Sequence, residues 1–140
     1  MSKAAIVYWS GTGNTELMAQ KVLEGARAAG AEALIFRAAD FSAGMMDEFD
    51  AIAFGCPSMG AEQLEESEFE PMFTACRPGL RGKKIVLFGS YGWGDGEWMR
   101  TWEADCRADG AQLLAEPVIC NELPDADAQE ACIALGRALA

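Results

Sequence analysis

The first residues that could do chemistry form a charge-free polar stretch, SGTGNT, at positions 10–15. It follows an apolar run and contains three hydroxyl groups, one amide side chain and two glycines. If such a stretch opens a helix, the unpaired N–H groups and the positive end of the helix dipole favour a phosphate. The triphosphate pattern GxxxxGK[ST] fails because the lysine is missing, and the dinucleotide pattern GxGxxG fails because Glu16 replaces its third glycine. The stretch therefore predicts a site for one phosphate held by neutral donors.

Two later stretches contain side chains suited to a flat ring. Met59 and Gly60 follow an apolar run, and the stretch GSYGWGDGEW places Tyr91 and Trp93 among four glycines. Aromatic side chains in a glycine-rich loop are poor core material but good stacking surfaces. The residues after Gly60 are acidic with no base among them, and a solvated acidic face is the simplest interpretation for most of them. These glutamates stand at 62, 65, 66, 68 and 70.

Together, these stretches predict a phosphate cradle and two walls for a planar heterocycle. The walls are the sulfur of Met59 and the indole of Trp93. Flavin mononucleotide (FMN) carries one phosphate and one large flat ring, so we expect FMN as the cofactor. The alternative for residues 10–15 is a turn whose glycines and hydroxyls only cap a helix.

Five apolar runs indicate the strands that must position these loops. The first, third and fourth runs are apolar on successive residues, which is typical of strands buried on both faces of a sheet. Helical patterns lie between the runs, and Trp98 and Trp102 have the spacing of core residues on one helix. Five β–α units with short connections predict an α/β fold, a parallel sheet covered by helices on both faces. The expected strands are Ala4–Trp9, Ala33–Phe36, Ala51–Gly55, Ile85–Gly89 and Gln112–Ile119.

In such a sheet, ligands bind beyond the carboxyl ends of the strands. The loops to examine are therefore 10–15, 56–66 and 90–97, which follow the first, third and fourth expected strands. Asp125 or Asp127 is expected to cap the last helix, and Pro71 suits the first position of another.

Composition excludes several classes of function. The chain has 140 residues, the size of one domain, and a net charge of −11, which disfavours nucleic acid as a partner. It contains no histidine, so Ser-His-Asp and Cys-His catalysis are excluded. Its five cysteines lack the Cys-x-x-Cys spacing of zinc sites, and buried free thiols are expected. No apolar run is long enough to span a membrane, so we expect a cytoplasmic protein of one domain, residues 1–140.

At this point the sequence closely resembles a short-chain flavodoxin. YWSGTGNTE resembles the phosphate-loop signature of that family, and SMGAEQLEESEFEP and LFGSYGWGDGEWMR resemble its two flavin loops. The three motifs occur in the family's order and the match spans nearly the whole chain. The resemblance implies a three-layer α-β-α sandwich whose five-stranded parallel sheet has the order 2-1-3-4-5. It also implies tightly but non-covalently bound FMN and one-electron transfer between redox enzymes.

The resemblance also implies roles for individual residues. The phosphate would be held by Ser10, Thr12, Asn14 and Thr15. Met59 would cover the inner face of the ring and Trp93 its outer face, while Glu62 would accept a hydrogen bond from the ring N3–H. Backbone N–H groups of residues 92–94 would face the pyrimidine edge. The complete expected cofactor site is Ser10, Gly11, Thr12, Gly13, Asn14, Thr15, Ser58, Met59, Gly60, Ala61, Glu62, Ser90, Tyr91, Gly92, Trp93 and Gly94.

Two details of the acidic loop follow from this interpretation. With Gly60 and Ala61 as the central pair of a four-residue turn, the type II form of the turn places Ala61 at positive φ. The second electron that the ring accepts makes it an anion. Carboxylates near the ring would disfavour that negative charge and so lower the reduction potential of this second one-electron step. The carboxylates expected there are Glu62, Glu65, Glu66 and Asp95.

The resemblance, together with the acidic loops, therefore implies a low-potential electron carrier without catalytic residues or a metal. We expect a monomer whose redox-partner proteins dock transiently through basic patches, with no nucleic acid or membrane as partner. An FMN-dependent NAD(P)H:quinone reductase on the same fold is the main alternative, and it would need space for nicotinamide beside the flavin. A response-regulator receiver is rejected, because that fold needs acidic residues after the first strand and an aspartate ending the third, where this chain has Gly55-Cys56.

Overall fold

The computed structural model describes residues 2–140 and contains one six-stranded, entirely parallel sheet. Its strand order is β2-β1-β3-β4-β5, and β6 pairs with the end of β4 beyond β5. The predicted α/β fold and strand order are confirmed. The strands are β1 (Lys3–Tyr8), β2 (Glu32–Arg37), β3 (Ala51–Gly55), β4 (Lys84–Tyr91), β5 (Gln112–Leu113) and β6 (Val118–Asn121).

The predicted fifth strand, Gln112–Ile119, is wrong as one continuous element. Its first two residues form β5 against the beginning of β4, and the chain then leaves the sheet until β6. Pro117 lies in the break and lacks the N–H group that a ladder hydrogen bond needs. Both pieces still pair with β4, so the carboxyl end of the last strand remains at the same edge as the others.

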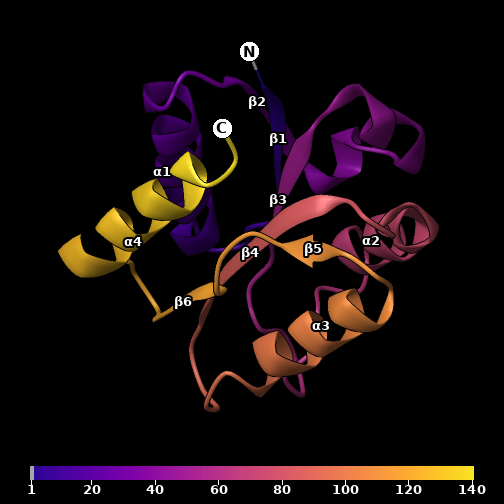
Figure 1. Cartoon of the computed structure of the whole chain (residues 1–140). Coiled ribbons are helices and arrows are strands. Elements are labelled where there is room, and N and C mark those ends of the chain that lie inside the picture. The colour runs from indigo at the N-terminus through magenta and orange to yellow at the C-terminus, as the bar shows by residue number, and fades with distance from the viewer. Residues whose placement is uncertain (1) are drawn as a thin grey trace.

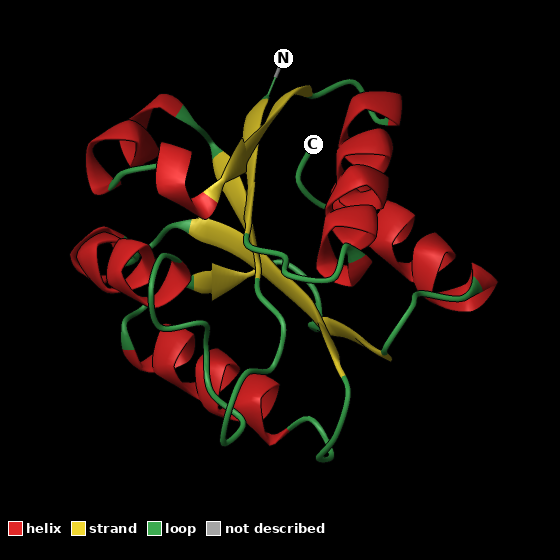
Figure 2. Ribbon diagram, turned by 180° about the vertical axis from the view of Figure 1, so that it is seen from behind, coloured by secondary structure: helices red, strands yellow, loops and turns green. Residues whose placement is uncertain are grey.

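Helices cover both faces of the sheet (Figures 1 and 2). One core lies under α1 and α4, where Met18, Val22 and Leu135 pack on Ile6 and Phe88. The other lies under α2 and α3, and the predicted core residues Trp98 and Trp102 are buried there. The α-helices are α1 (Asn14–Ala28), α2 (Phe69–Cys76), α3 (Glu97–Ala108) and α4 (Ala126–Arg137).

The connection between β2 and β3 differs from the expected β–α unit. It contains two short 3-10 helices, η1 (Ala38–Asp40) and η2 (Ala43–Glu48), in place of an α-helix. Phe36, Phe41 and Phe49 hold this connection by packing their rings together, with centroids 5.4 to 6.2 Å apart. Three aromatic anchors therefore fix residues 38–50 in place without an α-helix.

Helix ends follow the expected chemistry with one exception. Asp125 caps α4, because its carboxylate accepts a hydrogen bond from the Ala128 N–H at 2.8 Å. Pro71 is the third residue of α2, so the prediction that it opens the helix is wrong. The third position still lies in the first turn, where an N–H group has no partner within the helix, so proline costs no hydrogen bond there.

Candidate cofactor site

The loops at the carboxyl ends of the strands enclose a cavity of about 540 Å³. It contains residues of all three predicted loops, because the strands that carry them are parallel neighbours, and eight of the sixteen predicted site residues line it. None of its lining residues is lysine or arginine. The lining residues are Trp9, Gly11, Thr12, Asn14, Pro57, Ser58, Met59, Ser90, Tyr91, Gly92, Glu122 and Leu123.

Ser10 organises the loop between β1 and α1. Its hydroxyl oxygen accepts hydrogen bonds from the N–H groups of Gly13, at 3.1 Å, and Glu16, at 3.2 Å. Gly13 has φ of +97°, a left-handed conformation that favours glycine, and its carbonyl accepts the first helical bond from Leu17. The loop therefore has its own internal scaffold before any ligand binds.

The remaining polar groups of this loop are available to a ligand. Within residues 2–140, the backbone N–H groups of Gly11, Thr12, Asn14 and Thr15 have no acceptor, and the side chains of Thr12 and Asn14 make no hydrogen bond. Thr12 and Asn14 both line the cavity. This set of neutral donors at the start of a helix can hold a single phosphate, so these residues fit the phosphate end of FMN.

Thr15 lies beneath this donor set. It is buried, and its hydroxyl is 3.1 Å from the hydroxyl of Ser90, which is also buried at the end of β4. The Ser90 N–H also donates to the Thr15 hydroxyl, at 3.4 Å, and the Ser90 carbonyl accepts from the Ser58 N–H at 3.0 Å. Thr15, Ser58 and Ser90 thus connect the three predicted loops to one another.

The turn after β3 is closed differently from the expectation. Met59 and Gln63 exchange two backbone hydrogen bonds, at 2.8 and 2.9 Å, which leaves three residues between them. Positive φ falls on Gly60 and Glu62, both at 52°, and not on Ala61. The expected four-residue turn with Gly60 and Ala61 at its centre is therefore wrong for this structure, because the closing partner is Gln63.

Glu62 ties this turn to the loop after β4. Its carboxylate accepts a hydrogen bond from the N–H of Glu97, the first residue of α3, at 3.1 Å. The carboxylate also lies against Gly94, where an added Cβ would be 2.6 Å from the Glu62 Cδ. Gly94 has φ of +86°, a left-handed conformation that favours glycine, and a side chain there would also have to displace the Glu62 carboxylate.

The two predicted ring walls differ in their exposure. Met59 is 37% exposed and lines the cavity, while Trp93 is 64% exposed and is not among the lining residues. Tyr91 and Gly92, which precede Trp93, do line the cavity. The structure thus brings the inner predicted wall to the cavity and leaves the indole of Trp93 at its outside.

Three of the five glutamates, Glu66, Glu68 and Glu70, are exposed as predicted for most of the acidic run, but Glu65 is not. Glu65 is buried, and its carboxylate accepts bonds from the hydroxyl and N–H of Ser67 and from the N–H groups of Glu68 and Phe69. Burial alone would raise the pKa of Glu65, but these hydrogen bonds outweigh it and lower the pKa. Glu68 is exposed and accepts a bond from the indole of Trp9 at 2.9 Å. Glu65 is therefore a structural cap at the start of α2.

Asp95 and Glu66 are the other carboxylates expected near the ring. Asp95 forms an ion pair with Arg100 at 2.9 Å, and the hydrogen bond and positive charge of Arg100 lower the pKa of Asp95. Neither Asp95 nor Glu66 lines the main cavity. The carboxylate that does is Glu122, which the sequence interpretation missed.

Four lining residues lie outside the predicted set: Trp9, Pro57, Glu122 and Leu123. Glu122 and Leu123 follow β6, and the Glu122 N–H donates to the Tyr91 carbonyl at 2.8 Å. The rule that ligands bind at the carboxyl ends of strands would have found them, had it been applied to the last strand as well.

No other reactive group stands out in the described residues. All five cysteines are free, and burial raises the pKa of each thiol above its ordinary value. Residues 2–140 contain no cluster of three or more potential metal ligands. Over the same residues, no helix combines the length and apolar character needed to cross a membrane.

Comparison with known proteins agrees with this geometry. The family model described as "Flavodoxin" matches residues 6–136. The flavodoxins of Megasphaera elsdenii and Clostridium beijerinckii are 48% and 42% identical to this chain, each covering 96% of it and 96% and 97% of the relative. A solution structure of the two-electron reduced Megasphaera elsdenii flavodoxin is 46% identical, covers 97% of both chains and superposes with a TM-score of 0.89. A match of this length, on a chain whose strand-end loops form one cavity, shows that the protein belongs to the flavodoxin family.

Proposed function

We propose that this protein carries single electrons at low potential between redox proteins. The family is one of FMN-containing electron carriers, so FMN is its cofactor and electron transport its general role. When bound, FMN supplies the redox chemistry, because it can gain or lose one electron at a time. The observation that carries the proposal is the cluster of unpartnered neutral donors at residues 11–15, at one end of a cavity lined by Met59.

The residues of the chain would divide the work of binding. The N–H groups of residues 11, 12, 14 and 15, with the side chains of Thr12 and Asn14, hold the phosphate. The Ser10 hydroxyl already accepts two backbone bonds, and its proton remains free to donate to the same group. Met59 packs on the inner face of the ring and Trp93 on the outer face, while Glu62 orients the pyrimidine edge.

Fixed negative charge near the cavity would lower the reduction potential of the bound FMN. Glu122 lines the cavity and Glu62 lies on the turn beside it, without an ion-pair partner for either within residues 2–140. A carboxylate ~10 Å from an added negative charge costs about 1.7 kcal/mol at an effective dielectric of about 20, as an unscreened upper bound. Since about 1.4 kcal/mol corresponds to 59 mV for one electron, two such charges lower the potential by the order of 100 mV.

We further propose that the protein works as a cytoplasmic monomer and meets its partners through basic patches on their surfaces. Its net charge of −11 favours association with basic proteins. No observation favours the alternative quinone reductase, because the cavity has no lysine or arginine lining that could receive the phosphates of a nicotinamide cofactor.

An absorption spectrum of the purified protein and a potentiometric titration test this function. A yellow protein with one FMN per chain and two separate one-electron steps supports it. A protein that purifies colourless and does not quench added FMN contradicts it. Rapid bleaching of the bound flavin by NADH alone would instead support the reductase.

A further inference from the structure

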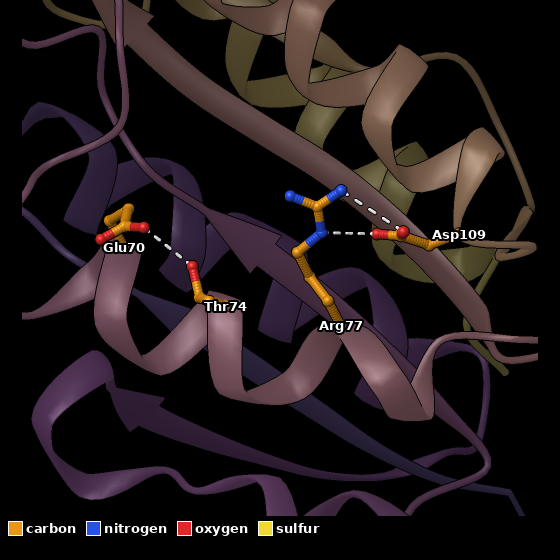
Figure 3. A network of polar contacts seen from close by, with 4 residues as sticks. All are labelled: Glu70, Thr74, Arg77 and Asp109. Carbon is orange, nitrogen blue, oxygen red and sulfur yellow. Dashed lines mark hydrogen bonds and ion pairs between the residues drawn. The ribbon is translucent and has the colours of Figure 1, made fainter.

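A second cavity, of about 420 Å³, lies between α2 and α3 on the face of the sheet opposite α1 and α4. We call it the α2–α3 groove. Figure 3 shows one side of it, with Glu70 and Thr74 on α2 and Arg77 reaching Asp109 beyond the end of α3. The lining residues are Glu62, Gln63, Leu64, Glu66, Glu70, Phe73, Thr74, Arg77, Trp98, Thr101, Trp102 and Asp105.

The floor of the groove is aromatic. Phe73, Trp98 and Trp102 are each at most 3% exposed, and the ring of Trp102 meets that of Phe73 edge-on at 5.6 Å. The indole N–H of Trp102 is buried and has no hydrogen-bond acceptor within residues 2–140. Because these rings are almost fully buried, they give the groove an apolar floor on which an aliphatic group can rest.

The rim of the groove is acidic without a free base. Its carboxylates are those of Glu62, Glu66, Glu70 and Asp105. Arg77 is the single basic residue of the lining, and it already forms two hydrogen bonds to Asp109, at 2.7 and 3.3 Å. The groove therefore combines an apolar floor with uncompensated negative charge, which matches a long basic side chain.

The groove is also continuous with the cofactor site. Glu62, Gln63 and Leu64 line the groove, and Met59 of the same turn lines the cofactor cavity. The hydrogen bonds between Met59 and Gln63 join the two linings directly. A partner held in the groove would thus lie beside the loops that enclose the cofactor.

We propose that the α2–α3 groove receives an arginine or lysine side chain of the redox-partner protein during docking. The aliphatic stem packs on the floor of Phe73, Trp98 and Trp102, and the cationic group lies among the rim carboxylates. Arginine suits the groove better than lysine, because its planar guanidinium can bind two carboxylate oxygens at once and the rim offers several carboxylates. This inference rests on the proposed function and names the chemistry of the partner.

A minimal probe tests the groove itself. The FMN-loaded protein, labelled with ¹⁵N on tryptophan, gives four indole signals, and Trp102→Phe identifies that of Trp102. N-acetyl-arginine amide should shift the Trp102 signal at millimolar concentration, while the uncharged isostere N-acetyl-citrulline amide should shift it at least about five-fold less. In Glu70→Gln/Asp105→Asn the arginine probe should lose its effect. Equal shifts from both probes, or none from either, overturn the proposal.

A protein probe tests docking. Cytochrome c is a basic protein that accepts one electron per encounter, so it is mixed with the reduced, FMN-loaded protein at low salt. Glu70→Gln/Asp105→Asn should slow the second-order rate about five-fold or more. The matched control Glu32→Gln/Glu130→Gln removes the same charge from exposed positions on β2 and α4, and should slow the rate less than about two-fold.

A small uncharged quinone separates this inference from the proposed function. Parent, groove variant and control should all reduce the quinone at one rate, because it needs no basic docking contact. Equal slowing of both double variants with cytochrome c would show that only total charge matters and would overturn the proposed docking role of the groove. If the parent itself fails to bind FMN or to reduce the quinone, the proposed function fails instead.

Discussion

Replacing Glu65 by glutamine tests whether one buried carboxylate holds the cofactor-side loop to α2. Glu65 lies between the turn at 59–63 and the helix, and its carboxylate accepts four hydrogen bonds. One oxygen receives the N–H groups of Glu68 and Phe69, both at 2.8 Å, and the other receives the N–H and hydroxyl of Ser67. Glutamine keeps the shape of the side chain but only one acceptor oxygen.

The expected cost follows from that geometry. If the amide oxygen keeps the two bonds from Glu68 and Phe69, the amide NH₂ group faces the Ser67 N–H, and two donors then oppose each other. An N–H group left without its acceptor costs about 1–3 kcal/mol. Loss of the negative charge at the start of α2 adds about 0.3–1 kcal/mol. The free energy of unfolding should therefore fall by about 2–3 kcal/mol relative to the parent.

The control is the neighbouring Glu66→Gln, which removes the same charge from an exposed side chain without a hydrogen-bond partner in the described residues. Urea unfolding at pH 7 and one fixed FMN concentration compares the two variants, because FMN stabilises any protein that binds it. Glu66→Gln should change the free energy of unfolding by no more than about 0.5 kcal/mol. Equal effects of the two substitutions would refute the role of Glu65 as a cap.

The pH dependence of the free energy of unfolding gives a second, independent test of the Glu65 cap. The pKa of Glu65 is lowered in the folded protein, so the ionised carboxylate stabilises the fold fully above its unfolded value of about 4.3. This stabilisation is lost as the pH falls from there through the lower, folded pKa. Between pH 5 and pH 3 the parent should therefore lose more stability than Glu65→Gln. A parallel decline in both proteins would mean that the hydrogen bonds do not favour the ionised form.

Three further substitutions test other parts of the site and its frame. Trp93→Ala should weaken FMN binding by about 1–3 kcal/mol in a fluorescence titration, while an unchanged dissociation constant removes the indole from the site. Thr15→Val should lower the free energy of unfolding by about 1–2 kcal/mol because it leaves the buried Ser90 hydroxyl without its partner, whereas exposed Thr12→Val should affect FMN binding alone. Gly25→Ala places a Cβ 1.9 Å from the Ile133 carbonyl oxygen on α4 and should cost about 3 kcal/mol, while Gly44→Ala, with nothing within 4 Å, should be nearly neutral.

The sequence predicts the central sheet well, because strands buried on both faces leave a clear apolar pattern in the sequence. The middle strands are apolar on successive residues, and β1, β3 and β4 are almost entirely buried in the structure. Their parallel order then brings loops 10–15, 56–66 and 90–97 to one edge. What the apolar pattern does not contain is the interruption at Pro117, because the residues around it remain mostly apolar and only the pairing with β4 is lost.

The details of the acidic loop are less predictable, because they depend on which residues form hydrogen bonds with one another. Glu65 and Glu66 are chemically identical neighbours, yet one is buried with four donors and the other is exposed. The difference arises because the chain turns at Ser67 and places the first N–H groups of α2 around Glu65. In the same way, closure of the turn by Gln63 rather than Glu62 moves the second positive φ away from Ala61.

The polar groups of the site loops therefore divide into two kinds that residue type alone does not separate. Ser10, Thr15 and Glu62 bond within the protein, whereas Thr12 and Asn14 make no side-chain bond within residues 2–140 and line the cavity. The bonded groups fix the loops before a ligand arrives, so less conformational entropy is lost on binding. The unbonded groups can then be satisfied by the ligand or by water. We therefore expect the loop at residues 10–15 to hold a phosphate mainly through the groups that its own hydrogen bonds leave free.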